Sequence, residues 1–177
     1  MLAPGSAIMI TDVIEFIKSV LRVLIARTKV SKARRMFKRG EDTQKVKDTV
    51  WFGCRFHWSD PIYVPAALDL AFALYDRDRG GSTRQVAHCM LLLGRVFSSA
   101  GDKLPACRFF LCAREMFRST GDSFTVPAME FFREELDRRD RKSCFSMSRD
   151  VFETRYADQT ASRLVKKYRN RNPRRRG

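Results

Sequence analysis

Two clusters of lysine and arginine are the residues whose types and spacing point to a chemistry, which is the binding of phosphate groups. The first cationic run consists of Arg27, Lys29, Lys32, Arg34, Arg35, Lys38 and Arg39, and the second of Arg163, Lys166, Lys167, Arg169, Arg171, Arg174, Arg175 and Arg176. Neither run contains an acidic residue, and together they account for the whole formal net charge of +15. Because the excess charge is concentrated in two segments, we expect a polyanionic partner, nucleic acid first and an anionic membrane surface second.

Residues for catalysis or metal binding form no recognisable pattern. The sequence has no nucleophile elbow, phosphate-binding loop or H-E-x-x-H motif, and His57 and His88 lack metal-ligand spacing. One acidic cluster is interleaved with arginines at helical spacing, as on a solvated, salt-bridged helix face; it comprises Glu130, Glu134, Glu135 and Asp137 with Arg133, Arg138 and Arg139. We therefore expect a protein that is not an enzyme and that binds neither a cofactor nor a metal.

The five cysteines are odd in number and include no C-x-x-C pair, which argues against a zinc site. Cys89, Cys107 and Cys112 lie in apolar runs, where a thiol behaves as a small hydrophobic group. Buried thiols favour a reducing, intracellular compartment, and the mitochondrial matrix is preferred to the cytoplasm or nucleus.

Residues 12–39 are predicted to form a long amphipathic helix that carries the first cationic run. Asp12 with Glu15 resembles a capping pair, Gly40 is placed to end the helix, and an apolar stripe follows helical spacing at Val13, Ile17, Val20, Leu21, Leu24 and Ile25. Charges at positions 12, 15, 18 and 22 interrupt the apolar run, so we expect neither a membrane span nor a secretory signal. Because two of these charges flank the stripe closely, we expect Ile17, Val20, Leu21 and Leu24 to be buried against protein and not lipid.

The composition allows one core with basic extensions, since 44% of the 177 residues are hydrophobic and fourteen are phenylalanine. We divide the chain into an N-terminal basic helix with its linker (1–49), a helical domain (50–162) and a basic tail (163–177). The linker is placed at 41–49, a short strand or extended segment at 50–58, and helices at 65–79, 82–99, 105–120, 127–141 and 148–168. The fold class is therefore mainly α, a helical bundle or a short array of helical hairpins, with an extended Arg-rich C-terminal tail.

One stretch resembles a tetratricopeptide repeat. The stretch "LLLGRVFSSAGDKLPACRFFLCA" reproduces the repeat pattern L-G-x-x-Y followed by A-x-x-x-F. The matching residues are Leu93, Gly94, Phe97, Ala106 and Phe110, with Gly101 at the turn and Ala113 at the second small position. Met90 stands at the usual tryptophan position, the closing proline is missing, and residues 121–154 do not continue the pattern. The resemblance covers 84–117 and a degenerate half repeat at 66–74, and it implies two closely packed antiparallel helices that dock protein neighbours.

The preferred functional interpretation is a non-enzymatic, structural RNA-binding subunit of a large ribonucleoprotein, and in this the chain resembles a supernumerary (mitochondrial) ribosomal protein. The cationic runs are expected to bind RNA, rRNA by that resemblance, through phosphates and without sequence readout. Tyr168, Asn170 and Asn172 are suited to stacking on unpaired bases or hydrogen bonding to them. Neighbouring subunits would bind the N-terminal stripe and the hairpin. Two alternatives stay open: a viral matrix-like or accessory protein that bridges nucleocapsid and membrane, and a small adaptor whose tail is a nuclear localisation signal.

Overall fold

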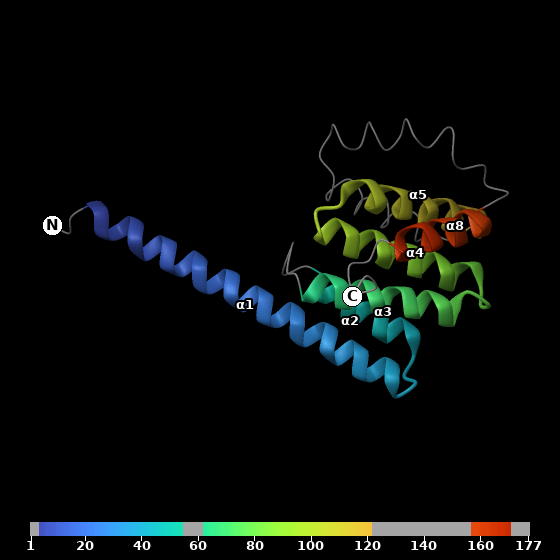
Figure 1. Cartoon of the computed structure of the whole chain (residues 1–177), viewed down its shortest axis with the longest axis horizontal. Helices are drawn as coiled ribbons and strands as arrows, with labels where there is room; N and C mark the ends of the chain where they lie inside the picture. The colour runs from blue at the N-terminus through green and yellow to red at the C-terminus, as the bar shows by residue number, and fades with distance from the viewer. Residues whose placement is uncertain (1–3, 55–61, 122–156, 171–177) are drawn as a thin grey trace.

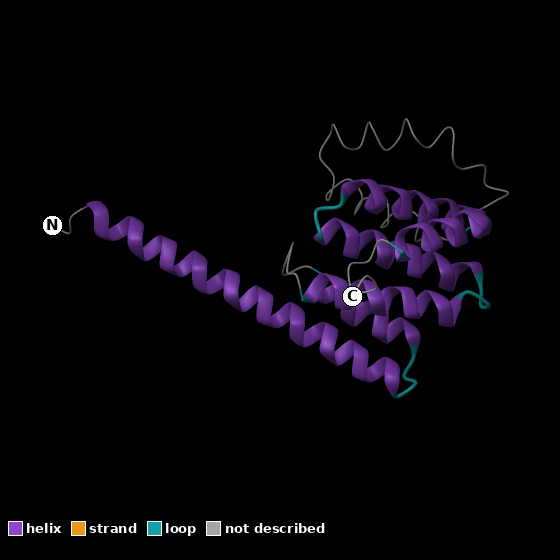
Figure 2. Cartoon of the chain, viewed as in Figure 1, coloured by secondary structure: helices purple, strands orange, loops and turns teal. Residues whose placement is uncertain are grey.

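A computed structural model describes residues 4–54, 62–121 and 157–170 of the chain. Every regular element in these ranges is an α-helix, which confirms the mainly α fold class (Figure 2). The helices are α1 (Pro4–Lys38), α2 (Thr43–Gly53), α3 (Tyr63–Asp78), α4 (Thr83–Ser99), α5 (Lys103–Ser119) and α8 (Ala157–Arg169). Helices α2 to α5 form a stack, α8 lies against it, and α1 extends away from it (Figure 1).

Helix α4 is the centre of the stack, in contact with α2, α3 and α5. Every residue from Cys89 to Ser99 is buried, so α4 is covered all round over most of its length. Aromatic rings join the layers: the Phe97 ring stacks on the Phe109 ring of α5 with centroids 5.5 Å apart, and the Tyr168 ring of α8 lies 5.6 Å from Phe97. Such pairs add to the free energy gained from burial alone.

The helical hairpin predicted around 84–117 is present as α4 and α5. A Ser82–Gln85 capping box begins α4, and Gly101, at a φ of 75°, makes the turn after it. The two helices lie close together at Gly94, where a Cβ atom would lie 2.6 Å from the Phe110 ring. The small residues of α5 at this interface, Ala106 and Ala113, are fully buried. Helix α3 likewise matches the helix predicted at 65–79.

The long N-terminal helix ends where the sequence predicts, but it begins earlier. Gly40, at a φ of 73°, donates its backbone N–H to the Phe37 carbonyl, and Glu41 donates to the Met36 carbonyl, which is the bonding of a glycine-terminated helix end. The predicted start at Asp12 is wrong, because α1 begins at Pro4. Proline suits a first helical turn, and no glycine or proline interrupts residues 6–39.

The charged linker predicted at 41–49 is wrong, because most of it belongs to α2. Asp42 caps this helix, since its carboxylate accepts a hydrogen bond of 3.0 Å from the Lys45 backbone N–H. Val46, Val50 and Cys54 recur every fourth residue and are buried, a helical stripe that the flanking charges conceal in the sequence. The strand or extended segment predicted from residue 50 is therefore helical as far as 53, and residues 55–61 lie outside the described ranges. The domain boundary drawn at 49/50 falls within α2.

Only one side of the second half of α1 contacts the body. Ala26, Val30 and Ala33 are buried there, and their small side chains allow α2 to approach until a Cβ on Gly53 would lie 3.2 Å from the Lys29 Cβ. The apolar stripe expected to be buried is instead exposed in this chain, at Ile17, Val20, Leu21 and Leu24 alike. The N-terminal part of α1 extends beyond the stack (Figure 1). The expected burial is wrong because the contacts of α1 with α2 and α3 use the opposite side of the helix.

The C-terminal half is described in part. Of the helix predicted at 148–168, residues from Ala157 onward form α8, in which Ala161, Leu164 and Val165 are buried. The helix predicted at 127–141, with its acidic cluster, lies outside the described residues.

Candidate nucleic-acid interface

The first cationic run presents most of its charges to solvent. Lys32, Arg34, Arg35, Lys38 and Arg39 are exposed, and Arg27 and Lys29 are half-buried. The Lys29 ammonium lies 4.8 Å from the centroid of the Phe52 ring, so this lysine also contributes to the packing of α2 on α1. The exposed members can therefore meet phosphates without any rearrangement of the helix that carries them.

A second group of cations surrounds a cleft between the α3–α4 turn and α8. The cleft has a volume of about 910 Å³, and its basic lining residues are Arg77, Arg79, Lys166 and Arg169. Asp76 is the one acidic residue among the described residues that line it. Arg77 and Arg79 belong to neither cationic run, and no sequence pattern singles them out, because acidic neighbours at 76 and 78 balance their charges locally.

Arg77 connects the cleft with the end of the first cationic run. Its guanidinium donates a hydrogen bond of 3.3 Å to the Gly40 carbonyl and lies 5.5 Å from the centroid of the Phe37 ring. Gly40 follows directly after Lys38 and Arg39, so these cations, Arg77 and the cleft are neighbours. Segments about 130 residues apart in the sequence, α1 and α8, thereby contribute to one basic region of the surface.

The second cationic run divides into exposed and anchored members. Arg163, Lys166 and Lys167 are exposed. Arg169 is instead held by the body: its guanidinium lies 2.8 Å from the Asp76 carboxylate, donates 3.1 Å to the Phe72 carbonyl and lies 5.3 Å from the Phe72 ring centroid. Arg169 therefore fastens the end of α8 to α3. Arg171, Arg174, Arg175 and Arg176 lie outside the described residues.

Tyr168 is a core residue and not a platform for bases. Its side chain is 2% exposed, its ring packs on Phe97 and Phe109, and its hydroxyl accepts a hydrogen bond of 2.8 Å from Arg108. The expectation that it stacks on RNA is therefore corrected, because it supplies the apolar anchor of α8. Asn170 is exposed and lines the cleft, and Asn172 lies outside the described residues.

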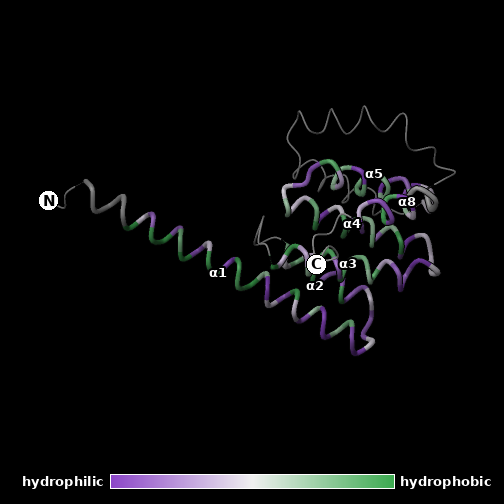
Figure 3. The backbone as a smooth tube through the Cα atoms, viewed as in Figure 1, coloured by the Kyte–Doolittle hydropathy of each residue, from purple (hydrophilic) through white to green (hydrophobic). Residues whose placement is uncertain are grey.

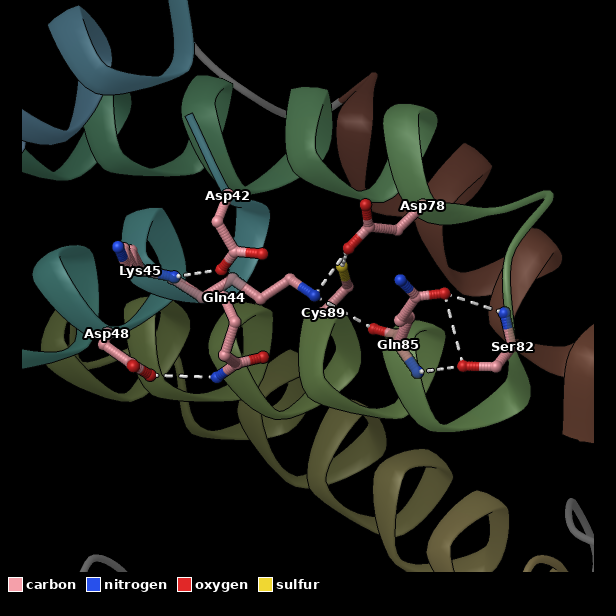
Figure 4. Close-up of polar contacts among 9 residues, drawn as sticks. Asp42, Gln44, Lys45, Asp48, Asp78, Ser82, Gln85 and Cys89 are labelled. Atoms are coloured by element: carbon pink, nitrogen blue, oxygen red, sulfur yellow. Dashed lines mark hydrogen bonds and ion pairs between the residues drawn. The ribbon is translucent and has the colours of Figure 1, made fainter. Parts of the chain in front are cut away.

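A buried polar network fixes the end of α3 that bears the cleft arginines. The Lys47 ammonium of α2 lies 2.5 Å from the Asp78 carboxylate and donates a hydrogen bond of 3.2 Å to the Gln85 carbonyl. The Cys89 thiol donates to the same carboxylate over 3.6 Å (Figure 4). Because Asp78 points inward while Arg77 and Arg79 are exposed, the network sets which way the last turn of α3 faces.

The expectation of buried thiols is confirmed at two of its three cysteines, Cys89 and Cys112, and is wrong at the third, Cys107. Cys54, Cys89 and Cys112 are buried thiols, and burial raises the pKa of the Cys89 thiol from 9.0 to about 12. Cys107 is buried but disulfide-bonded, so the expectation of a thiol at that position is wrong.

Two features are absent from the described part of the chain. Within it, no group of three or more His, Cys, Asp or Glu side chains is arranged to hold a metal ion. Among the described helices, none is long and apolar enough to cross a membrane.

Comparison with known proteins adds no family assignment. No protein-family model matches the chain, and searches of curated proteins and of solved structures return no match. Function must therefore be argued from the site.

Proposed function

We propose that the protein is a non-enzymatic, structural RNA-binding subunit of a large ribonucleoprotein, of the kind represented by accessory mitochondrial ribosomal proteins. The observation that supports this most is the basic region around Arg77, where the exposed end of the first cationic run meets a cleft lined by Arg79 and Lys166. Phosphate binding needs charge and reach and no reacting group, which is what these side chains provide.

In this proposal the RNA backbone is held by position and charge. Arginine and lysine bind phosphate oxygens and release the counterions condensed on the RNA, so affinity falls steeply with salt. Contacts of this kind fix the orientation of a protein on nucleic acid and carry no sequence information. The cleft, about 910 Å³ in volume, is large enough to admit a nucleotide between Arg79 and Lys166.

The hairpin formed by α4 and α5 is the proposed contact for neighbouring proteins. We interpret it as a tetratricopeptide-like unit, because the ring of Phe110 lies over Gly94 and because Ala106 and Ala113 are buried between the helices. Repeat hairpins of this type pack one on another and present a surface to partner chains.

The test is a salt titration of RNA binding with two unrelated single-stranded RNAs of equal length. Replacing Arg79 and Lys166 by alanine should reduce the slope of log K against log salt by about 1.4, taking roughly 0.7 per lost phosphate contact. The matched control is Arg118→Ala, which removes an exposed arginine of α5 that does not line the cleft. An unchanged slope in the cleft variant would refute the proposed interface.

A truncation tests the tail separately. It should begin after Asn170, because Arg169 is anchored to Asp76 and is therefore part of the folded body. Removing residues 171–177 deletes four arginines, so a flatter salt slope is expected. A slope that does not change would assign the tail to targeting instead.

A further inference from the structure

The side of α1 that faces away from the stack has two parts. From residue 10 to residue 25 it is apolar and exposed, with exposed fractions from 38% to 69%; its members are Ile10, Val13, Ile14, Phe16, Ile17, Val20, Leu21, Leu24 and Ile25. From residue 32 onward it carries Lys32, Arg34 and Arg35 of the first cationic run. Figure 3 shows hydrophobic and hydrophilic residues alternating along the extended part of the helix.

Helix geometry places these two parts on one continuous side. At about 100° per residue, the exposed apolar residues span an arc of roughly 180°, and Lys32, Arg34 and Arg35 fall within the same arc. The opposite side holds Asp12, Glu15 and Ser19, in line with Ala26, Val30 and Ala33, and those last three residues are buried against the stack. The apolar and cationic parts therefore both point away from the body.

A flat surface can reach this side of α1 without meeting any of the other described helices. The stack lies on the other side of the helix, where the buried alanines are, and α1 extends beyond it (Figure 1). The exposed apolar segment of 16 residues is about 24 Å long, at 1.5 Å per residue. Its length and openness suit a contact along the helix rather than around its end.

We propose that this outward side of α1 docks on the surface of an anionic lipid bilayer. The apolar part would lie at the boundary between headgroups and acyl chains, and the cations that follow on the same side would contact lipid phosphates and carboxylates. The width of the apolar arc favours lipid over a single protein helix. A partner helix covers a narrower stripe and would leave residues at both edges, such as Phe16 and Ile25, exposed to water.

The acidic residues of this segment do not oppose the contact. Asp12 and Glu15 lie on the side that would face water. Glu15 forms an ion pair of 2.7 Å with Lys18, and this lysine lowers the pKa of the Glu15 carboxyl, which stays charged and solvated there. Along the sequence, these charges interrupt the apolar run and argue against a membrane contact. Their position around the helix decides whether they meet the bilayer, and the two acids lie on the side away from it.

The first experiment uses the full chain without RNA and vesicles of phosphatidylcholine with or without phosphatidylserine. Leu21→Asp adds an acid to the outward side, and Ser19→Asp adds the same charge to the opposite side of the same turn. We expect Leu21→Asp to weaken flotation with the anionic vesicles on the order of tenfold or more, and Ser19→Asp to have an effect several times smaller. Equal effects of the two variants, or no flotation of the wild-type chain, would overturn the proposal.

A second experiment changes only the alignment of the two parts. Inserting two alanines between Ile25 and Ala26 rotates the apolar part by about 200° relative to the cationic part, whereas inserting seven returns it to within about 20°. Flotation should be lost with two alanines and retained with seven. Flotation that does not depend on the length of the insert would contradict the proposed continuous face.

Two controls separate this proposal from other outcomes. RNA binding by Leu21→Asp should equal that of the wild-type chain, since no cation is lost, so the lipid and RNA proposals can fail independently. Sizing in the absence of vesicles tests whether a second copy covers the apolar face. A dimer that Leu21→Asp converts to a monomer would assign this face to self-association and overturn the lipid proposal.

Discussion

Replacing Lys47 by methionine should destabilise the fold strongly, because the change leaves a carboxylate buried without its ammonium partner. The side chains of Lys47 and Asp78 are only 4% and 5% exposed, and the ammonium lies 2.5 Å from the carboxylate oxygen. Removing one member of a buried ion pair typically costs about 3–5 kcal/mol. That is a large part of the total stability of a domain, which is about 5–15 kcal/mol.

The contacts of the two groups explain this magnitude. Lys47 also donates to the Gln85 carbonyl over 3.2 Å, so the same substitution removes a second hydrogen bond. The Cys89 thiol remains near Asp78 at 3.6 Å, but a thiol is a weak donor and compensates little. The methionine side chain recovers part of the apolar contact made by the lysine stem, so the loss reported by this variant is mainly electrostatic.

The assay is urea denaturation followed by circular dichroism, with two comparison chains. Lys18→Met makes the same substitution in the exposed Lys18–Glu15 pair, whose side chains are 52% and 59% exposed, and should leave the midpoint unchanged. Lys47→Met combined with Asp78→Leu should recover most of the lost stability, since no charge is left buried. A loss below about 1 kcal/mol for Lys47→Met, the size expected of an exposed pair, or a double variant no more stable than the single one, would refute this reasoning.

Three further predictions follow from single contacts. Gly94→Ala places a methyl group 2.6 Å from the Phe110 ring, so thermal denaturation should show a net loss of about 1–2 kcal/mol, the overpacking cost less the gain in helix propensity; Phe110→Leu in the same chain should relieve part of it. Because burial raises the pKa of the Cys89 thiol from 9.0 to about 12, the unfolded chain loses this proton first. Stability should therefore fall as the pH rises from about 9 towards 12, by up to about 1.4 kcal/mol per pH unit, and Cys89→Ala should remove that component from pH-dependent urea curves. Arg169→Ala should cost about 1 kcal/mol, a small value because its partner Asp76 is 43% exposed to screening solvent, and it should leave the salt slope of RNA binding unchanged.

The parts of the fold that the sequence predicts well are those with local signals. The hairpin is recognisable because Ser82 caps one helix, Gly101 makes the turn, and small residues recur where α4 and α5 meet. Helix α2 was missed because its stripe of Val46 and Val50 is brief and surrounded by charges. Its stability depends on contacts with α1 and α4, which no local pattern contains.

The sequence predicts which segments carry the positive charge of the candidate site. It does not predict how those side chains are arranged in space. Runs of lysine and arginine identify the exposed cations of α1, but a local count of charge hides Arg77 and Arg79 among acidic neighbours. Whether a cation is available for phosphate depends on its tertiary partners: Arg169 belongs to a basic run and is nevertheless held by Asp76 and the Phe72 carbonyl. Asp78 points inward, where it pairs with Lys47 from another helix, while the arginines on either side of it are exposed.

The arrangement of α1 bears on how the two proposed partners would share the protein. Arg77 contacts Phe37 and Gly40, and Phe37 lies on the side of α1 that faces the stack, whereas Lys32, Arg34 and Arg35 lie on the outward side. A polyanion in the cleft and a bilayer along α1 would therefore occupy different sides of the same helix. RNA and lipid would compete only for the outward cations. The exposed apolar residues would contact lipid alone, since they offer nothing to RNA phosphates. The cleft cations would stay available while α1 lies on a membrane, so the two activities are compatible in one chain.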